Sequence, residues 1–250
     1  MLKPPIARIG GKSKLRKKII EMIPEHTCYC EPFFGAGWVF FGKEQSKIEV
    51  INDKDKELIN LFKMLKFHSD EVERYLRYEI SSRDTFKDYK KMDIEFLTEI
   101  QRAVRYIYII SQSFASKGTV YGYGTNTKPS PAIFNEDFSL LRNRLKSAYI
   151  ENLDYENILD KYDREYTFFF CDPPYIGTAG YEEKFTIEDH INLSNKLKNI
   201  EGKFLLTIND HEISRELYNM FNIKEVEVGY SVSRAKEARK KYKELIITNY

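Results

Sequence analysis

The sequence predicts an α/β fold in which a mostly parallel sheet is covered by helices on both faces and carries an inserted subdomain. Short apolar runs typical of buried strands alternate with amphipathic helical stretches near both ends of the chain. Between them, residues 67–110 have helical patterns and no strand signal. We therefore expect one domain made of residues 1–55 and 155–250, interrupted by a mainly helical subdomain over residues 56–154.

The expected elements follow from the apolar patterning. Buried parallel strands are expected at residues 27–30, 48–51, 166–171 and 203–208, and two further strands at 223–233 and 242–250. Helices are expected over 55–66 and 186–200, where apolar side chains recur at helical spacing, and Thr186 is the expected N-cap of the second. A helix is also expected to open after the stretch CEPFFGAGW.

The composition is that of a globular protein with reduced thiols. Hydrophobic residues make up 42% of the chain and charged residues 31%, and no apolar run approaches the ~18–20 residues of a membrane span. The N-terminus is basic but has no apolar segment typical of a secretion signal. Three cysteines without paired metal spacing and four scattered histidines predict a cytoplasmic protein without a metal site.

The net charge is only +2, but basic residues are concentrated in three blocks. Residues 1–20 hold seven basic residues and no acid, residues 102–148 hold seven against two acids, and residues 231–243 hold six against one. Such blocks are either solvated surface, balanced by acids elsewhere, or contacts to a polyanion. Charge alone does not decide between these two readings.

A glycine-rich turn follows the first expected strand. In EPFFGAG, residues 31–37, glycines allow the backbone to approach a ligand closely. The dinucleotide-binding fingerprint is absent, because Phe40 stands where its third glycine would fall. Asp53 lies 18 residues after Gly35, just past the second strand, where an acid suits two ribose hydroxyls. The pair favours a nucleoside-containing cofactor over the alternative of a glycine turn and a surface acid.

The stretch RIGGKSK near the N-terminus is not a P-loop, because Ile6 occupies the position of the required first glycine. A Gly-Gly-Lys turn can still direct the ammonium group of Lys12 at a carboxylate. The alternative is a basic N-terminal turn without a ligand.

The chain carries its most apolar run directly into Asp172-Pro173-Pro174-Tyr175. Two prolines cannot continue a ladder, so the strand must end here, at the sheet edge where ligands of open α/β folds bind. A carboxylate oxygen and a prolyl carbonyl are two acceptors that match the two N–H donors of an exocyclic amino group. Tyr175 can stack on the ring that carries this amino group. The alternative is a proline turn with a capping acid.

The order Gly-Gly-Lys, EPFFGAG, an acid after the second strand, an insertion and then DPPY resembles the Dam-type DNA adenine-N6 methyltransferases. The resemblance covers the whole chain, strongly over residues 8–62 and 166–250 and loosely between them. It implies a Rossmann-like S-adenosylmethionine-dependent domain with an inserted target-recognition subdomain. It also implies site-specific transfer of methyl to a flipped-out adenine of double-stranded DNA, by a protein active as a monomer, with a cognate restriction endonuclease as a further partner in some systems.

The resemblance also implies roles for individual residues. Lys12 would contact the cofactor near its methionine end, Asp53 would take the ribose hydroxyls, and Phe33 and Gly35 would line the pocket. Asp172 would serve both cofactor and base, the prolyl carbonyls of Pro173 and Pro174 would face the amino group, and Tyr175 would stack on the adenine. Arg8 departs from the aromatic residue that the family often has two positions before Gly-Gly, so either it stacks on the cofactor through its guanidinium plane or that contact is lost.

Two other functions remain open on the sequence alone. Related DPPY or NPPY pockets act on RNA guanine amino groups and on protein glutamine amides, and a non-catalytic DNA-binding relative is also conceivable. For the DNA methyltransferase we expect the segment 115–128 of the insertion, ASKGTVYGYGTNTK, to reach a groove. Its expected contacts are Lys117, Tyr121, Tyr123 and Lys128.

Overall fold

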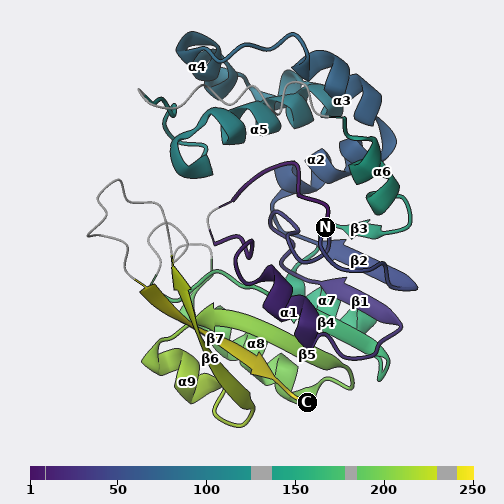
Figure 1. Cartoon of the computed structure of the whole chain (residues 1–250), viewed down its shortest axis with the longest axis vertical. Coiled ribbons are helices and arrows are strands. Elements are labelled where there is room, and N and C mark those ends of the chain that lie inside the picture. Colours follow the sequence, from purple (N-terminus) through teal and green to yellow (C-terminus); the bar gives the residue numbers. More distant parts are fainter. Residues whose placement is uncertain (9, 125–136, 178–184, 230–240) are drawn as a thin grey trace. The chain divides into compact units, whose positions relative to one another are not determined.

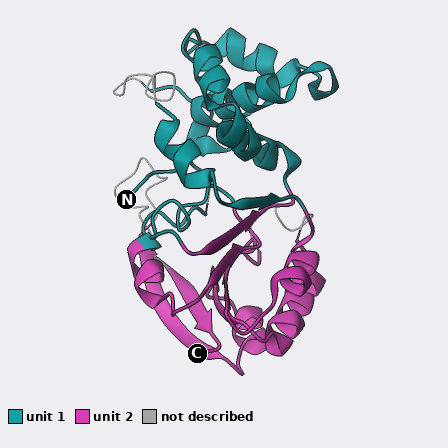
Figure 2. Cartoon of the chain, turned by 90° about the vertical axis from the view of Figure 1, so that its right-hand side faces the viewer, with its two compact units in different colours: residues 1–16, 35–45, 55–152 teal, residues 17–34, 46–54, 153–250 magenta. Residues whose placement is uncertain are grey.

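The computed structural model describes residues 1–8, 10–124, 137–177, 185–229 and 241–250. These residues form two compact units (Figure 2). The first comprises residues 1–16, 35–45 and 55–152, and the second comprises residues 17–34, 46–54 and 153–250. In the described residues, no helix is both long and apolar enough to cross a membrane.

A seven-stranded sheet runs in the order β3-β2-β1-β4-β5-β7-β6. The strands are β1 (Cys28–Glu31), β2 (Ile48–Asn52), β3 (Tyr149–Glu151), β4 (Thr167–Cys171), β5 (Lys203–Asn209), β6 (Asn222–Gly229) and β7 (Lys241–Thr248). β2, β1, β4 and β5 are mutually parallel, and β7 lies antiparallel between β5 and β6. The mixed sheet confirms the predicted α/β class, and its order reverses between β1 and β4, as in doubly wound folds.

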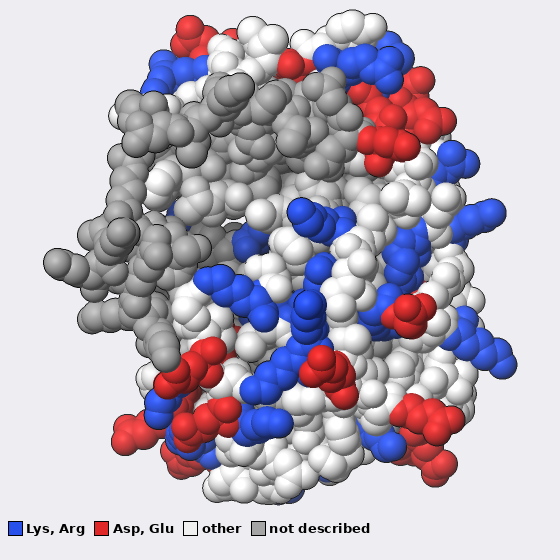
Figure 3. Space-filling model, in the orientation of Figure 1, with Lys and Arg blue, Asp and Glu red and all other residues white. Residues whose placement is uncertain are grey.

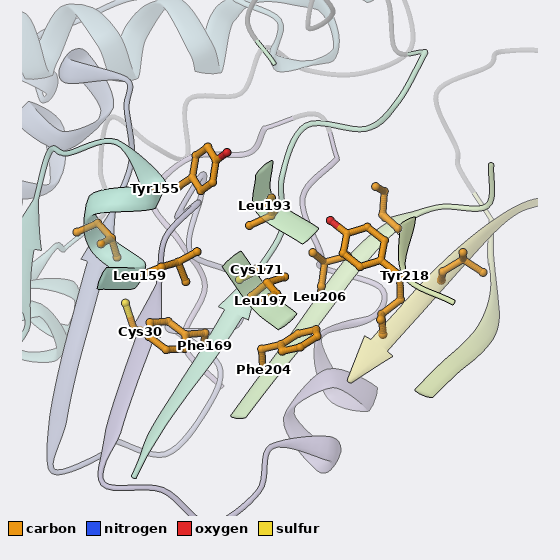
Figure 4. Close-up of a cluster of buried hydrophobic side chains, with 14 of the residues drawn as sticks. Cys30, Tyr155, Leu159, Phe169, Cys171, Leu193, Leu197, Phe204, Leu206 and Tyr218 are labelled. Atoms are coloured by element: carbon orange, nitrogen blue, oxygen red, sulfur yellow. The ribbon is translucent and has the colours of Figure 1, made fainter. Parts of the chain in front are cut away.

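One face of this sheet packs on α7 (Tyr155–Tyr162) and α8 (Ile187–Asn199). Because side chains alternate along a strand, the alternate residues of each strand form a continuous apolar layer. Figure 4 shows strand residues such as Cys30, Phe169 and Leu206 meeting Leu159 of α7 and Leu193 of α8. The burial of this layer holds the second unit together.

The intervening residues of the strands point to the other face. Phe168 of β4 and Tyr29 of β1 lie there with ring centroids 5.9 Å apart. Figure 1 shows α1 (Arg16–Met22) in front of the strands, while α7 and α8 lie behind. The helices on both faces are therefore those expected of an alternating α/β chain.

Thr186 caps α8 as predicted. Its hydroxyl accepts from the backbone N–H of Asp189, and the Asp189 carboxylate accepts from the N–H of Thr186 in return, forming a capping box. α9 (Glu212–Leu217) then connects β5 to β6.

The first unit is mainly helical. It contains α2 (Lys56–Phe67), α3 (Ser69–Leu76), α4 (Arg83–Lys91), α5 (Glu99–Gln112) and α6 (Ser139–Leu145), with 3₁₀ turns at Ile94–Phe96 and Phe114–Ser116. α5 is the central helix, because it contacts α2, α3 and α4. Its buried stripe of Ala103, Val104 and Ile107 supplies the middle of this helical core.

One local expectation was wrong, and one strand was not predicted. No helix opens after β1, because Gly35 and Gly37 adopt positive φ values of 52° and 75°, which a helix cannot contain, and the chain makes turns instead. The short strand β3 had no signal in the sequence, since its residues Tyr149–Glu151 are only partly buried and lack the apolar run of the other strands.

Candidate active site

Three adjacent parallel strands end at one edge of the sheet and bring the predicted site residues of the second unit together. Glu31 at the end of β1 pairs with Ile51 of β2, and Cys30 pairs with Phe169 of β4. Phe33, Asp53 and Asp172 therefore leave the same edge, on both sides of the point where the strand order reverses. In open α/β sheets this point is the usual ligand-binding crevice.

The carboxylate of Asp172 is oriented by the neighbouring strand. The hydroxyl of Thr207 on β5 donates to Asp172 Oδ1 at 2.8 Å. Thr207 is fully buried, whereas Asp172 is half-buried, directly after β4. The hydrogen bond restricts rotation of the carboxylate, so its acceptor oxygens have a defined direction at the sheet edge.

The chain after Asp172 is also held by β5. Asn209 accepts from the backbone N–H of Ile176 at 3.1 Å and donates to the carbonyl of the same residue at 2.9 Å. One amide side chain thus satisfies both backbone groups of Ile176, in the way that a strand partner would. The two prolines leave no N–H for a sheet ladder, and Asn209 supplies the missing attachment.

The side chain of Tyr175 is held by packing of its ring and by a hydrogen bond of its hydroxyl. Its ring packs against the apolar layer of the second unit, and its hydroxyl donates to Glu244 Oε2 on β7 at 2.8 Å. Glu244 is 1% exposed. The sequence drew attention to the ring alone.

Asn52, the last residue of β2, holds the backbone beside Asp53. Its side chain donates to the carbonyls of Pro32 and Leu153 and accepts from the N–H of Leu153. Its own carbonyl accepts from the N–H of Phe34. Asn52 therefore connects the segment after β1 to the start of α7. Because Asp53 is the next residue, its backbone begins from this fixed point.

Phe33 lies in a cluster of aromatic rings. Its ring stacks on Tyr155 with centroids 5.3 Å apart, and Phe185 meets it edge-on at 5.6 Å. Half-burial leaves part of the Phe33 ring accessible. An accessible, supported ring of this kind can bind a flat ligand.

His190 of α8 contacts the same aromatic cluster. Its ring is 1% exposed and meets Phe185 edge-on, with centroids 4.7 Å apart. Burial lowers the pKa of His190 to about 4, against the smaller opposing effects of Asp189 and of the Pro174 carbonyl, which favour the protonated ring. The imidazole is therefore neutral at pH 7.

The remaining cofactor candidates belong to the first unit. Lys12 is 4% exposed, and its ammonium group donates to the carbonyl of Gly10 at 2.9 Å. A buried cation is costly unless it meets acceptors, so its placement is a specific feature of this turn. At Gly35, an added Cβ would meet no atom of the described chain within 4 Å, which leaves room above the turn.

Arg8 pairs with an acid at the start of α2. Its guanidinium lies 3.3 Å from Asp55 Oδ2, and Asp55 caps α2 by accepting from the N–H groups of Glu57 and Leu58. Tyr106 also donates to Asp55. The Arg8 side chain keeps 26% of its surface exposed.

The candidate DNA-binding residues differ in exposure. Lys117 and Tyr123 are exposed, with Tyr123 at 68%, whereas Tyr121 packs edge-on against Phe86 of α4. Lys128 lies outside the described residues. Arg83 of α4 had no signal in the sequence, but its guanidinium lies 5.1 Å from the ring centroids of both Tyr121 and Tyr123.

The segment 112–122, which carries Tyr121 and directly precedes Tyr123, is closed by backbone hydrogen bonds. The N–H of Phe114 donates to the carbonyl of Val120, and the N–H of Gly122 donates to that of Gln112. A Cβ at Gly122 would lie 3.0 Å from the Phe114 nitrogen, so a larger residue would fit only if the neighbouring backbone shifted slightly. Tyr123 is therefore presented from a rigid base on α5.

Lysine and arginine side chains gather on the front face, in the area of α1 (Figure 3). Lys17 is exposed and Lys18 half-buried within this helix. No cluster of three or more His, Cys, Asp or Glu suited to a metal ion occurs in the part of the chain that the structure describes. A hollow between α7 and α8, lined by Asp160, Asn195 and Lys196 among others, contains none of the predicted site residues.

The family model and the sequence relatives that match this chain indicate the same family. The model of the D12 class N6 adenine-specific DNA methyltransferases matches residues 9–232. The Type II methyltransferase M1.LlaDCHI of Lactococcus lactis subsp. cremoris is 29% identical, with 100% of this chain and 96% of that protein covered. The DNA adenine methylases of Haemophilus influenzae and Escherichia coli are 27% and 24% identical and cover 98% and 95% of this chain, and 92% and 91% of their own lengths.

The family match extends over the glycine turn after β1, the acid after β2 and the DPPY segment after β4, and over the helical segment between them. It confirms the resemblance drawn from the motif order, and adenine amino groups of DNA are the acceptors of this family. The chain belongs to the D12 class of N6 adenine-specific DNA methyltransferases.

Proposed function

We propose that this methyltransferase uses S-adenosylmethionine to methylate a specific adenine that has been flipped out of double-stranded DNA. The observation that carries the proposal is the Asp172 carboxylate, oriented by Thr207 at the carboxyl end of β4. An oriented acceptor at this edge suits an amino group that must be held in one position during transfer.

The residues present fit the proposed cofactor. Asp53 leaves the end of β2 at the position from which an acid binds ribose hydroxyls in nucleotide-binding α/β folds. The room above Gly35 lets a ligand approach the backbone, and Lys12 offers a buried positive charge for a carboxylate. We assign Asp53 to the ribose, Lys12 to the methionine end, and Phe33, Gly35 and Arg8 to the surrounding pocket.

When bound, S-adenosylmethionine supplies an electrophilic methyl group on a sulfonium. Asp172 and a carbonyl of Pro173 or Pro174 accept hydrogen bonds from the two N–H donors of the adenine amino group. These bonds raise electron density on the nitrogen and direct its lone pair toward the methyl group. The protein contributes positioning and electrostatics, and no covalent intermediate with the chain is needed.

The target nitrogen of adenine is paired inside a duplex, so the base must leave the stack at a cost of a few kcal/mol. Tyr175 would hold the extruded base by stacking on it. Phosphate contacts from the basic blocks would offset the cost of extrusion.

We assign target recognition to the subdomain of residues 56–154. In the first unit, Arg83, Tyr121 and Tyr123 form a cation–aromatic cluster, and Lys117 is exposed nearby in sequence. Such groups suit phosphate and base-edge contacts. Lys128 remains part of this proposal.

We also propose a cellular compartment, an oligomeric state and a partner for the protein. The described cysteines are all free and buried, which suits a reducing cytoplasm. We propose that the protein acts as a monomer. The L. lactis relative is named a Type II methyltransferase, and for this chain a cognate restriction endonuclease is accordingly the partner to look for.

The test is transfer of a labelled methyl group to duplex DNA, RNA and protein by the wild type and by Asp172→Ala. We expect label only in DNA adenine, and a loss of at least roughly a hundredfold in Asp172→Ala, since preorganised acceptors contribute about 3 kcal/mol or more. Label in RNA guanine or protein glutamine would change the substrate. Near-normal turnover by a folded Asp172→Ala protein would remove this motif from the mechanism, and a wild type that binds DNA without transfer would be a non-catalytic relative.

A further inference from the structure

The segment from Asp172 to Ile176 is attached to the sheet by three polar side chains, none of which belongs to a family motif quoted above. Thr207 bonds Asp172, Asn209 bonds both backbone groups of Ile176, and Glu244 accepts the Tyr175 hydroxyl. We call Thr207, Asn209 and Glu244 the polar clamp. Each side chain of the clamp forms hydrogen bonds with a different residue of the segment.

The clamp lies on one face of the sheet. Thr207 and Asn209 are two residues apart on β5, so they point to the same side. In the antiparallel pairing of β5 with β7, Asn209 stands directly opposite Glu244. The face is the one opposite the apolar layer that packs on α7 and α8, because Leu206 and Ile208 belong to that layer.

Glu244 is the costly member of the clamp. A carboxylate that is 1% exposed loses most of its hydration, and strand stability alone would be served as well by an apolar residue such as its neighbour Leu245. The hydroxyl of Tyr175 donates to it at 2.8 Å across 69 residues of sequence. A hydrogen bond at the tip of a tyrosine fixes where the ring lies, because it selects one χ1 rotamer.

We propose that Glu244 is a positioning residue for the flipped adenine, which acts by holding the Tyr175 ring at the place where the base stacks. This inference rests on the proposed function, in which Tyr175 is the stacking ring. Glu244 does not touch the reacting atoms. Its effect is on the fraction of time that the ring is correctly placed, and thus on the population of the extruded base.

The experiment is a double-mutant cycle with Glu244→Ala, Tyr175→Phe and the double variant, together with Glu244→Gln. Hydrogen bonds to charged groups contribute more free energy than neutral ones. Glu244→Ala and Tyr175→Phe are therefore each expected to lower kcat/KM for DNA by about tenfold to a hundredfold. The double variant should be no worse than the worse single variant, since both changes remove the same bond. Glu244→Gln keeps an acceptor oxygen and should stay within about threefold of the wild type.

A second readout separates positioning from folding. DNA with 2-aminopurine at the target position emits more strongly when the base leaves the stack, and this increase should shrink in Glu244→Ala and Tyr175→Phe while calorimetric S-adenosylmethionine affinity stays unchanged. Thr248→Ala is the matched control, because Thr248 is a buried polar residue on β7 whose hydroxyl donates to the nearby carbonyl of Tyr250. It should lower stability without changing the fluorescence.

The outcomes distinguish this inference from the proposed function. Additive effects in the cycle, or full fluorescence and activity in Tyr175→Phe, would overturn the role of Glu244, whereas an active Asp172→Ala would overturn the proposed function. If Glu244→Ala does not fold, Tyr175→Phe and Glu244→Gln still decide, because they leave the backbone and the packing of β7 in place.

Discussion

The hydroxyl of Thr207 donates to Asp172 Oδ1 at 2.8 Å and links the end of β4 to its parallel neighbour β5. Asp172 is the residue on which the proposed chemistry depends, and Thr207 is completely buried behind it. A residue outside the DPPY motif therefore contributes to the orientation of the motif's carboxylate.

Thr207→Val tests this control directly. The shape of the side chain is kept and the donor is lost, so the carboxylate can rotate, and we expect kcat to fall by about tenfold or more, as for hydrogen bonds to charged groups. Single-turnover methyl transfer to duplex DNA measures the effect. Thr207→Ser retains the hydroxyl and should recover most of the rate. An unchanged rate in Thr207→Val would show that the carboxylate is oriented by other groups.

Asp53→Ala should weaken binding of S-adenosylmethionine and leave the chemical step nearly unchanged. A ribose contact is far from the transferred methyl group, so it is the same in ground and transition states. We expect the cofactor KM to rise roughly tenfold to a hundredfold, with kcat within about threefold of the wild type. Lys54→Ala is the matched control, because Lys54 is the next residue and its exposed side chain forms a surface ion pair with Asp154. A large fall in saturated kcat at unchanged cofactor KM would contradict the ribose assignment.

The cluster of Arg83, Tyr121 and Tyr123 should act in DNA recognition. Lys117→Ala is expected to weaken all DNA alike and to lower the slope of log affinity against log salt by about one. Tyr123→Ala or Arg83→Ala should instead cost about 1–3 kcal/mol at one position of the site and relax it. Filter binding at several salt concentrations and mapping of methylated adenines measure the two effects. Lys87→Ala, on the same helix as Arg83, is the control for loss of one charge.

If none of these variants alters DNA affinity, its salt dependence or the methylated sequence, the segment has only a packing role. Tyr121→Ala should behave differently from Tyr123→Ala, because the ring of Tyr121 also packs on Phe86. It should lower the thermal stability of the protein as well as its affinity.

The stability of the protein should fall in mild acid because of His190. Its pKa is about 4 in the folded protein and 6.5 in the unfolded chain, so the unfolded chain binds the proton first as the pH falls. The contribution is complete above about pH 6.5 and is lost between pH 6.5 and about 4, by up to about 3 kcal/mol. Urea unfolding at pH 7 and pH 5 measures this loss, and His190→Gln should lose less between the two. Equal losses in both proteins would assign the acid sensitivity to other groups.

The sequence was sufficient for the sheet edge and for the motif residues on it. Proline pairs, glycine turns and an acid after a strand are local signals, and the parallel order of β2, β1 and β4 turns their sequence positions into one edge. The capping box of Thr186 and Asp189 was readable for the same reason, since both partners lie in one turn of chain.

The residues that hold the site were not readable, because their partners are distant in sequence. Asn209 and Glu244 each look like a polar residue at the end or the edge of an apolar strand, and nothing local reveals Ile176 or Tyr175 as their partners. Thr207 and Glu244 interrupt otherwise apolar strands, which is a weak local signal that these two residues have polar partners. The sequence indicates a role for the Tyr175 ring, and no local pattern shows that its hydroxyl bonds Glu244.

The position of β7 also has a consequence for synthesis of the protein. β7 inserts between β5 and β6, although it is made after both. Tyr175 leaves the ribosome 69 residues before Glu244, which is roughly 3 to 14 seconds at about 5–20 residues per second. During this interval the β7 side of β5 is unpaired and the hydroxyl of Tyr175 lacks its Glu244 partner, although every family motif of the chain has already been made. On the proposed function, correct placement of the tyrosine therefore waits until β7 has been synthesised and has paired with β5.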